Sequence, residues 1–309
     1  MRILLTGASG LVGAAFSRAA ARHGHAVTGI VGGFAGELPG LLARRTIDLG
    51  DEAAITAVVV EVLPDAIVNC AAVSEPALVE QDPARSQAPN VALPTTLARL
   101  AKKMKARFVH ISSEQAFDGA RNAPYAVDGA TSPINLYGRQ KVASEQAVYH
   151  AAAEFAATVR APLLMGNSPG GRRSTHERMF ADWAAGKTAQ LFSDEFRQPC
   201  TADNLAEVLL ELCERRELCG VLHWAGAELI SRHALGLALR EHFKLSPRRA
   251  PITAVTRLEK PEVARTRQAH LALDLAPLVN VLNTRPQTLA QQLAGLRVPP
   301  SSRDWYFAA

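Results

Sequence analysis

Aromatic residues and cysteines are scarce in this sequence. Phe, Trp and Tyr together make up 6% of the 309 residues, and no two of the four cysteines form a CxxC pair. This usage predicts free thiols in a reducing cytoplasm rather than a disulfide framework. His23 and His25 lack a third ligand at a suitable spacing, so we expect no metal site.

Long hydrophobic runs and basic runs interleaved with aromatics are also missing. The most apolar stretch, near residues 58–73, contains Glu61, Pro64 and Asp65, so it cannot span a bilayer. Lys and Arg exceed Asp and Glu by 34 − 29 = 5, a mild balance that suits a phosphate-bearing small molecule. We therefore expect neither nucleic acid nor membrane as a partner, and a cytoplasmic location.

What the sequence does have is a regular alternation of two patterns. Apolar residues make up 48% of the chain, and short β-branched runs alternate with longer segments of helical periodicity. Strands without internal charges that alternate with helices predict a parallel sheet covered on both faces. The expected fold class is therefore α/β, a doubly wound, Rossmann-like parallel sheet with a smaller C-terminal substrate lobe.

A glycine-rich turn follows the first expected strand, Ile3–Thr6. Gly7, Gly10 and Gly13 give a GxxGxxG spacing that opens the helical pattern of Leu11–His23. In this context such glycines are typical of a dinucleotide-binding loop, because they make a tight turn and let the backbone approach a pyrophosphate. The amides at the start of the helix would face the phosphates. The alternative is a tight turn that binds no ligand.

The alternation weakens after Pro162, where the chain becomes richer in Gly, Pro and Arg. We therefore expect a dinucleotide-binding domain over residues 1–162, with a returning segment at about 192–224. Residues 163–191 and 225–309 are expected to form the smaller substrate-binding lobe over the carboxyl edge of the sheet.

The choice of cofactor depends on the end of the second expected strand. Val31 stands there, where an acid would bind the ribose and exclude a 2′-phosphate. Arg44 and Arg45 come later and could either reach such a phosphate or simply be solvated. NADP and NAD both stay open, with NADP slightly favoured. Asp48 and Leu49 are expected either to contact the adenine or to form a surface turn.

Tyr137 and Lys141 lie one helical turn apart, so a phenol and an ammonium share one face of an expected helix. Ser112 and Ser113 end an earlier strand, at the edge where open parallel sheets bind ligands. A ketone reduced by a nicotinamide hydride leaves an alkoxide that needs a proton, and a tyrosine would supply it. The neighbouring ammonium would lower the tyrosine pKa from about 10, and Ser113 or Ser112 would donate to the carbonyl oxygen.

With these residues placed, the chain resembles the extended short-chain dehydrogenase/reductase family. Within it, the closer likeness is to dTDP-4-dehydrorhamnose reductases and their sugar-nucleotide-binding relatives. The chain is also similar to the regulatory β subunit of methionine adenosyltransferase, which shares that fold. The resemblance covers about residues 1–295, and these segments carry it: Thr6–Gly13, Pro64–Ala72, Asn90, Ile111–Gly119, Pro133–Gly138 with Lys141 and Glu145, Asp194–Thr201, Leu273-Asp274 and Arg285-Pro286.

The resemblance implies an NAD(P)-dependent oxidoreductase in which Tyr137 donates the proton, Lys141 is its partner and Ser113 polarises the ketone. The substrate wall is expected to include Ser113, Glu114 and Arg197, although an ordinary surface arginine is the alternative for Arg197. The residues expected to bind the cofactor are Gly7, Ser9, Gly10, Leu11, Val12, Gly13, Asp48, Leu49, Ala71, Ala72, Tyr137 and Lys141.

The expected function is NAD(P)H-dependent reduction of a 4-keto nucleotide-sugar. Glu114 and Gln115 stand where the family has Asp and Tyr, so the substrate itself stays open. Two alternatives remain: an NAD-dependent nucleotide-sugar epimerase or dehydratase, and a non-catalytic NAD(P)-binding regulatory subunit. The aromatic cluster Trp305-Tyr306-Phe307 could dock on the chain itself or on a second subunit of a homodimer.

Overall fold

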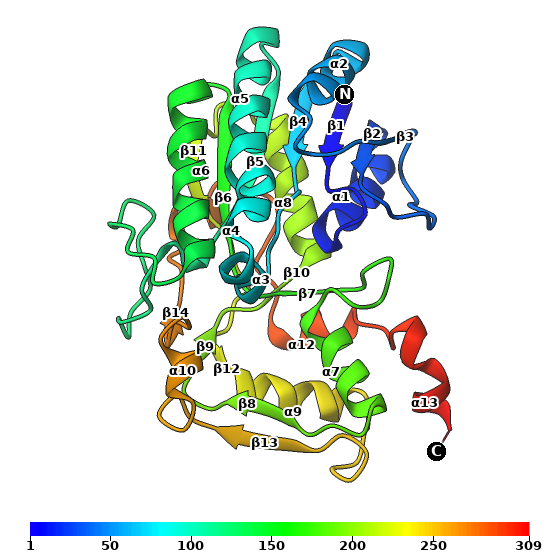
Figure 1. Ribbon diagram of the computed structural model, residues 1–309, viewed down its shortest axis with the longest axis vertical. Coiled ribbons are helices and arrows are strands. Elements are labelled where there is room, and N and C mark those ends of the chain that lie inside the picture. The colour runs from blue at the N-terminus through cyan, green and yellow to red at the C-terminus, as the bar shows by residue number, and fades with distance from the viewer. Residues whose placement is uncertain (309) are drawn as a thin grey trace.

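The computed structural model describes residues 1–308, and Figure 1 shows a sheet domain above a smaller lobe. The sheet has seven parallel strands in the order β11-β6-β5-β4-β1-β2-β3. The strand order reverses beside β1, which is the Rossmann-like arrangement and confirms the expected fold class. The strands are β1 (Arg2–Thr6), β2 (Ala26–Val31), β3 (Ala43–Thr46), β4 (Ala66–Asn69), β5 (Arg107–Ser113), β6 (Ala156–Ala161) and β11 (Gly220–His223).

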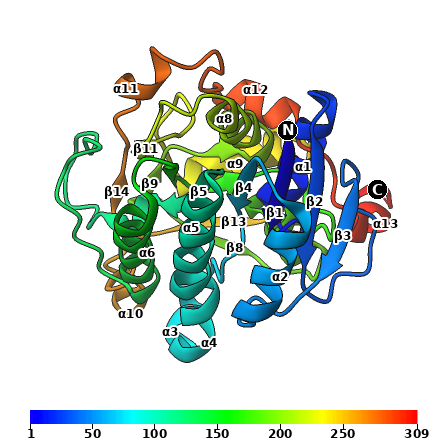
Figure 2. The same cartoon turned by 90° about the horizontal axis from the view of Figure 1, so that it is seen from above.

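Helices cover both faces of this sheet, as Figure 2 shows from above. Successive strand residues point to opposite faces, so Ile3 and Leu5 pack with α1 and α8, whereas Leu4 packs with α2 and α5. Both faces of the sheet are therefore buried, as a parallel sheet requires. The helical elements of this domain are α1 (Leu11–Arg22), α2 (Glu52–Val62), α3 (Pro76–Gln81), α4 (Pro83–Gln87), a π-helical turn (Ala88–Ala92), α5 (Leu93–Met104), a 3₁₀ turn (Glu114–Ala116), α6 (Leu136–Ala152), α8 (Ala202–Glu214) and α11 (Ala276–Val279).

The smaller lobe contains short strands from distant parts of the chain. Its two-stranded and three-stranded sheets have the orders β10-β7, β13-β8 and β12-β9-β14. Among residues 1–308, no helix has the length and apolar character needed to cross a bilayer. The elements are β7 (Leu164–Met165), α7 (Thr175–Ala184), β8 (Ala189–Phe192), β9 (Phe196–Arg197), β10 (Cys200–Thr201), β12 (Ile230–Ser231), α9 (Arg232–His242), β13 (Ile252–Val255), α10 (Pro261–Ala264), β14 (His270–Leu271), α12 (Leu289–Ala294), a 3₁₀ turn (Pro300–Ser302) and α13 (Arg303–Phe307).

The chain returns to the sheet domain later than the sequence suggests. The sequence predicts a return near residue 192, whereas β9 pairs with β12 and β14 in the smaller lobe. The returning segment joins the core of the sheet domain with α8, through Leu205 and Leu209. Conversely, Leu278 and Leu282 fall in the segment predicted for the smaller lobe, yet they pack in that same core. Local periodicity cannot assign such short elements, because their partners lie far away in the sequence.

The aromatic cluster at the C-terminal end docks on the chain itself. The Tyr306 hydroxyl donates to the carbonyl of Phe243 at 2.9 Å, and the Arg249 guanidinium lies 4.9 Å from the ring centroid of Trp305. Trp305 and Tyr306 also pack against the hydrophobic core of the smaller lobe. Of the two docking sites left open by the sequence, the structure therefore selects the intramolecular one for these two rings.

Candidate active site

The residues expected to carry chemistry gather where the sheet faces the smaller lobe. Figure 1 shows that the arrow of β1 points toward that lobe, and parallel pairing gives its neighbours the same direction. The glycine loop follows β1, Ala71 and Ala72 follow β4, and Ser113 ends β5. The structure thus brings three separate segments to one edge, which is where open α/β sheets bind ligands.

Close packing explains the three glycines of the loop. Gly7 has φ +67°, and a Cβ at this position would lie 2.7 Å from the Ala71 nitrogen. A Cβ on Gly13 would lie 2.2 Å from the Gly7 carbonyl oxygen, and one on Gly10 would lie 3.0 Å from the same oxygen. The loop is therefore pressed against both α1 and the segment after β4, as a dinucleotide-binding turn requires.

The start of α1 fits a phosphate group. Gly10 is its N-cap residue and provides no side-chain cap, so the first amides of this 12-residue helix lack a side-chain acceptor. Free amides and the helix dipole at such an end favour an anion. Ser9 and Leu11 flank this end and are half-buried, whereas Val12 packs in the core and offers only its backbone to a ligand.

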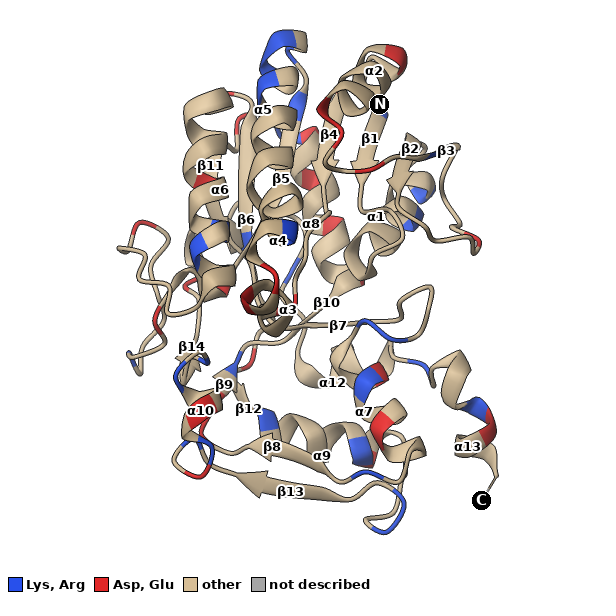
Figure 3. Cartoon of the chain, in the orientation of Figure 1, with Lys and Arg blue, Asp and Glu red and all other residues tan. Residues whose placement is uncertain are grey.

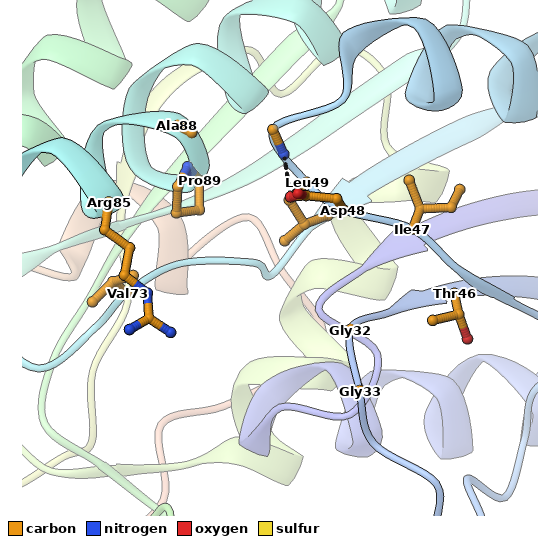
Figure 4. A pocket seen from close by; sticks show the side chains of 11 residues that line it. Gly32, Gly33, Thr46, Ile47, Asp48, Leu49, Val73, Arg85, Ala88 and Pro89 are labelled. Carbon is orange, nitrogen blue, oxygen red and sulfur yellow. Dashed lines mark hydrogen bonds between the residues drawn. The ribbon is translucent and has the colours of Figure 1, made fainter.

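A cavity of about 530 Å³ lies at the ends of β2 and β3. Asp48 and Leu49, the residues expected either to contact the adenine or to form a surface turn, line it, and Asp48 Oδ1 accepts a hydrogen bond from the Gly50 amide at 2.9 Å. Figure 4 shows these side chains above the Gly32 backbone. The lining residues are Gly32, Gly33, Thr46, Ile47, Asp48, Leu49, Gly50, Val73, Arg85, Ala88 and Pro89.

One prediction about this end of the cofactor site is wrong. Val31 is only 1% exposed and packs in the core, so Gly32, not Val31, meets the cavity. Of the two alternatives for Arg44 and Arg45, the structure favours surface residues, because both lie within β3 and neither lines the cavity. Arg44 donates to the Gly36 carbonyl at 3.0 Å, and Arg45 forms an ion pair with a glutamate on α2.

Asn90 fixes one wall of this cavity. Its side chain is buried in the π-helical turn, donates to the Val73 carbonyl at 3.1 Å and accepts from the Val73 amide at 2.9 Å. It also donates to Gln140 of α6 at 2.7 Å. The segment after β4 is therefore held against the helix that carries the expected proton donor.

That helix, α6, begins directly after Asn135, which is its N-cap residue. Asn135 Oδ1 accepts from the Gly138 amide at 2.8 Å, as an N-cap does. Its Nδ2 donates to Gln115 Oε1 at 2.8 Å and to the Thr266 carbonyl at 2.9 Å. One buried amide therefore joins the start of α6 to both the turn after β5 and the smaller lobe.

Tyr137, Lys141 and Ser113 come together below this cap. Tyr137 is 7% exposed, and the Lys141 ammonium lies 5.9 Å from the centroid of its ring. Lys141 Nζ donates to the carbonyl of Ile111 at 2.8 Å, which holds α6 against β5. Ser113 lies close enough to Tyr137 to affect the tyrosine pKa, and its Oγ accepts from the Gln115 amide at 3.2 Å.

The electrostatics of this group differ from the expectation. Burial raises the pKa of Tyr137 to about 12; the nearby Ser113 hydroxyl opposes this shift and the charge of Glu114 adds to it. Burial also lowers the pKa of Lys141 to about 8, against the opposing charge of Glu145. The predicted lowering of the tyrosine pKa by the ammonium is therefore not found: burial dominates, and the Lys141 charge is not among the causes of the shift.

The two serines of β5 have different roles. Ser112 donates to Glu145, and this carboxylate also pairs with Arg160 at 2.7 Å in the buried interior. Ser112 is thereby committed to a structural ion pair. Ser113, on the other face of the strand, is the hydroxyl beside Tyr137, so the structure decides between the two candidates.

Sequence reasoning missed a buried chain of hydrogen bonds between the glycine loop and α6. Thr6, the last residue of β1, donates to Asn69 Oδ1 at 2.5 Å, and Asn69 Nδ2 lies 3.0 Å from His110 Nδ1. His110 Nε2 then lies 3.0 Å from Ser144 Oγ, which donates to the Lys141 carbonyl at 2.7 Å. Burial lowers the pKa of His110 well below its ordinary value, so this chain is neutral.

Unlike this neutral chain, the neck, which is the region where the sheet domain joins the smaller lobe, contains charged side chains. Figure 3 shows blue and red residues gathered there, around β9, β14 and α10. Arg197 contacts Glu114 at 3.3 Å and Glu195 at 3.2 Å, and all three side chains are buried. Arg267 binds both oxygens of Glu195, at 2.7 and 2.8 Å, and Arg232 lies 3.9 Å from it. We call these five residues the neck cluster.

Glu114 is the unusual member of the neck cluster. Burial raises its pKa to about 8, despite the opposing charge of Arg197, and its Oε2 is buried without a hydrogen-bond partner among the described residues. Arg197 is therefore no ordinary surface arginine. The structure places two of the three residues predicted for the substrate wall, Glu114 and Arg197, in one contact, close enough to Tyr137 for the Glu114 charge to affect the tyrosine.

Comparison with known proteins identifies the family. The model of the RmlD substrate binding domain matches residues 1–296. The chain belongs to this family. A dTDP-4-dehydrorhamnose reductase of Mycolicibacterium smegmatis is 32% identical over 250 residues, which is 80% of this chain and 71% of that protein. The methionine adenosyltransferase 2 subunit beta of Xenopus tropicalis is 31% identical over 286 residues, 91% and 82% of the two chains.

Solved structures agree with this membership of the RmlD family. A hypothetical dTDP-4-dehydrorhamnose reductase from Sulfolobus tokodaii has a TM-score of 0.78 and 27% identity, and the match covers 96% of this chain and 100% of that one. A dTDP-4-dehydrorhamnose reductase from Bacillus anthracis, solved in complex with NADP, has a TM-score of 0.79 at 19% identity, over 93% and 95% of the chains. The second likeness shows the fold alone.

Proposed function

We propose that this protein is an NAD(P)H-dependent reductase of a 4-keto nucleotide-sugar. The observation that carries the proposal is the convergence of Ser113, Tyr137 and Lys141 beside a glycine loop with an uncapped helix start. Supporting it, one relative is named a dTDP-4-dehydrorhamnose reductase and one structural neighbour holds NADP. The bound nicotinamide would supply the hydride.

The cofactor would be held by backbone more than by side chains. The amides at the start of α1 would bind the pyrophosphate, and the cavity beside Asp48 and Leu49 would take the adenosine. Ala71 and Ala72 would border the bound dinucleotide next to Gly7, whose backbone packs against Ala71. Lys141, whose ammonium is held by Ile111, would hydrogen-bond the ribose next to the nicotinamide.

The phenol of Tyr137 would donate the proton that the reduced carbonyl oxygen needs. Burial keeps this phenol protonated at neutral pH, so it carries the proton that reduction consumes. Ser113 would donate to the oxygen on which charge develops.

A regulatory subunit remains the second candidate function. The observation that favours it is the 31% identity, over 91% of this chain, to a methionine adenosyltransferase subunit named beta. Such a subunit would bind the cofactor without turnover. Cofactor binding therefore cannot separate the two functions, whereas removal of the proton donor can.

The deciding experiment is Tyr137→Phe, assayed by NADPH oxidation with a panel of dTDP-, UDP- and GDP-linked 4-keto sugars. Loss of the phenolic oxygen should lower turnover by about two to four orders of magnitude and leave NADPH affinity within about threefold. Tyr149→Phe is the matched control, because Tyr149 lies on the same helix with 61% of its surface exposed. If neither the wild type nor the control variant oxidises NADPH with any of these sugars, the proposed reductase function is contradicted.

A further inference from the structure

The adenosine cavity holds one cation among its lining residues, and no pattern in the sequence singles it out. Arg85 lies on α4, next to Val73 in the cavity wall. Its backbone amide bonds Asp82, but its guanidinium makes no hydrogen bond or ion pair with any of residues 1–308. Figure 4 shows this guanidinium at the edge of the cavity, with Gly32 and Gly33 on another side.

The wall formed by Gly32 and Gly33 leaves room opposite this cation. A Cβ built on either glycine would meet no atom within 4 Å, so the end of β2 is open rather than packed. No carboxylate stands at that end, and the one carboxylate of the cavity, Asp48, is bonded to the Gly50 amide. An anion next to Gly32 would therefore meet no steric block, and the carboxylate of the same cavity is held by the Gly50 amide.

Other arginines near this end of the sheet are already engaged. Arg44 is bonded to a carbonyl and Arg45 to Glu61, and both lie outside the cavity. A phosphate on the adenosine ribose would be a dianion in need of a cation, and a guanidinium is the side chain that binds phosphate with two parallel hydrogen bonds.

We propose that Arg85 recognises the 2′-phosphate of NADP(H), and so determines which cofactor the protein prefers. The inference rests on the proposed function for the presence of a dinucleotide, and it adds the residue and the form of the cofactor. The cation comes from a helix after β4, on the opposite side of the cavity from the end of β2. The preference between NADP(H) and NAD(H) would then depend on a residue in the wall of the cavity that encloses the adenine base.

The experiment measures binding and needs no turnover. Isothermal titration with 5′-AMP, 2′,5′-ADP, NADH and NADPH is carried out on the wild type, on Arg85→Ala and on Arg85→Lys. Arg44→Ala is the control, because it removes an exposed arginine of the same end of the sheet that lies outside the cavity. Circular dichroism of each variant checks the fold.

The wild type should bind 2′,5′-ADP and NADPH more tightly than 5′-AMP and NADH. Arg85→Ala should weaken the two 2′-phosphorylated ligands by about 10- to 100-fold, the usual worth of charge-assisted hydrogen bonds, and change the other two by less than about threefold. Arg85→Lys should recover part of the loss, because it restores the charge without the paired donors. Arg44→Ala should change nothing.

Three outcomes would overturn the inference. An equal loss for 5′-AMP and 2′,5′-ADP would mean that the guanidinium covers the base instead of binding the phosphate. Unchanged affinities in Arg85→Ala would mean that the arginine binds neither. If the wild type binds none of the four ligands, the proposed function is contradicted together with the inference. The first two outcomes contradict only the role of Arg85, so the two kinds of failure can be told apart.

Discussion

Two buried polar regions of this molecule are built in opposite ways. Under the glycine loop, Thr6, Asn69, His110 and Ser144 form a chain of neutral hydrogen bonds that ends on the carbonyl of Lys141. In the neck cluster, two glutamates and three arginines are packed together, and only the Arg267 side chain is exposed. The first region supports the cofactor loop, and the second joins the two lobes.

The two regions should therefore differ in how their contribution to stability depends on pH. Neutral hydrogen bonds are inexpensive to bury when every partner is satisfied, and they do not change between pH 5 and 8. Buried charges require that each partner stays in place, because a lone buried charge costs several kcal/mol. We therefore expect the stability contributed by the hydrogen-bond chain under the glycine loop to be indifferent to pH and that contributed by the neck cluster to be sensitive to it.

The largest expected effect comes from breaking the nucleotide half. Gly13→Val places a Cβ 2.2 Å from the Gly7 carbonyl, so the loop must move away from α1. We expect NADPH affinity to fall at least about 1,000-fold, or about 4 kcal/mol, as measured by titration. Gly10→Ala should lower the affinity less, because its Cβ would lie 3.0 Å from the Gly7 carbonyl oxygen. Gly170→Ala is the control, because a Cβ there would meet no atom within 4 Å.

The neck cluster should give the next largest effect, on stability. Arg197→Ala leaves Glu114 and Glu195 buried with one cation fewer, so the free energy of unfolding should fall by about 3 kcal/mol. Arg267→Ala is the matched comparison: it also loses a Glu195 contact, but Arg267 is 40% exposed and water can replace it. A loss of the same size in both variants, by urea denaturation, would argue against burial as the cause.

The smallest expected effect is a difference in how the two regions' stability depends on pH. The pKa of Glu114 is raised to about 8, so its contribution to stability is present below its unfolded pKa and is lost as the pH rises toward 8. Glu114→Gln removes this dependence, and its stability relative to the wild type should rise by at least about 1 kcal/mol between pH 5 and 8. Asn69→Ala should destabilise equally at both pH values, and a slope there would contradict a neutral chain.

Much of the fold and the main site residues followed from the sequence, because their signals are local. A glycine spacing after a short apolar strand, and a tyrosine one turn from a lysine, need no knowledge of distant partners. Parallel pairing then brings Gly7, Ser113 and Tyr137 to the same edge, so their meeting was predictable.

The remaining features depend on contacts between distant segments. Ser112 and Ser113 point to opposite faces of β5, and only the packing of Glu145 and Arg160 shows which face is structural. His110 reads in the sequence as one more strand residue, since its two partners lie 41 positions before it and 34 after it. Arg85 was missed for the same reason, because its place in the cavity depends on the turns between β4 and α5.

Asn135 makes the position of Tyr137 depend on the smaller lobe. Its oxygen caps α6, and its nitrogen is bonded to Thr266, 131 positions further along the chain. A displacement of that distant loop would free the cap and loosen the first helical turn, on which Tyr137 lies. In the proposed reduction, residues that touch neither cofactor nor carbonyl would then tune the rate of proton transfer, and sequence change in the lobe would alter kcat while the reacting groups stay the same.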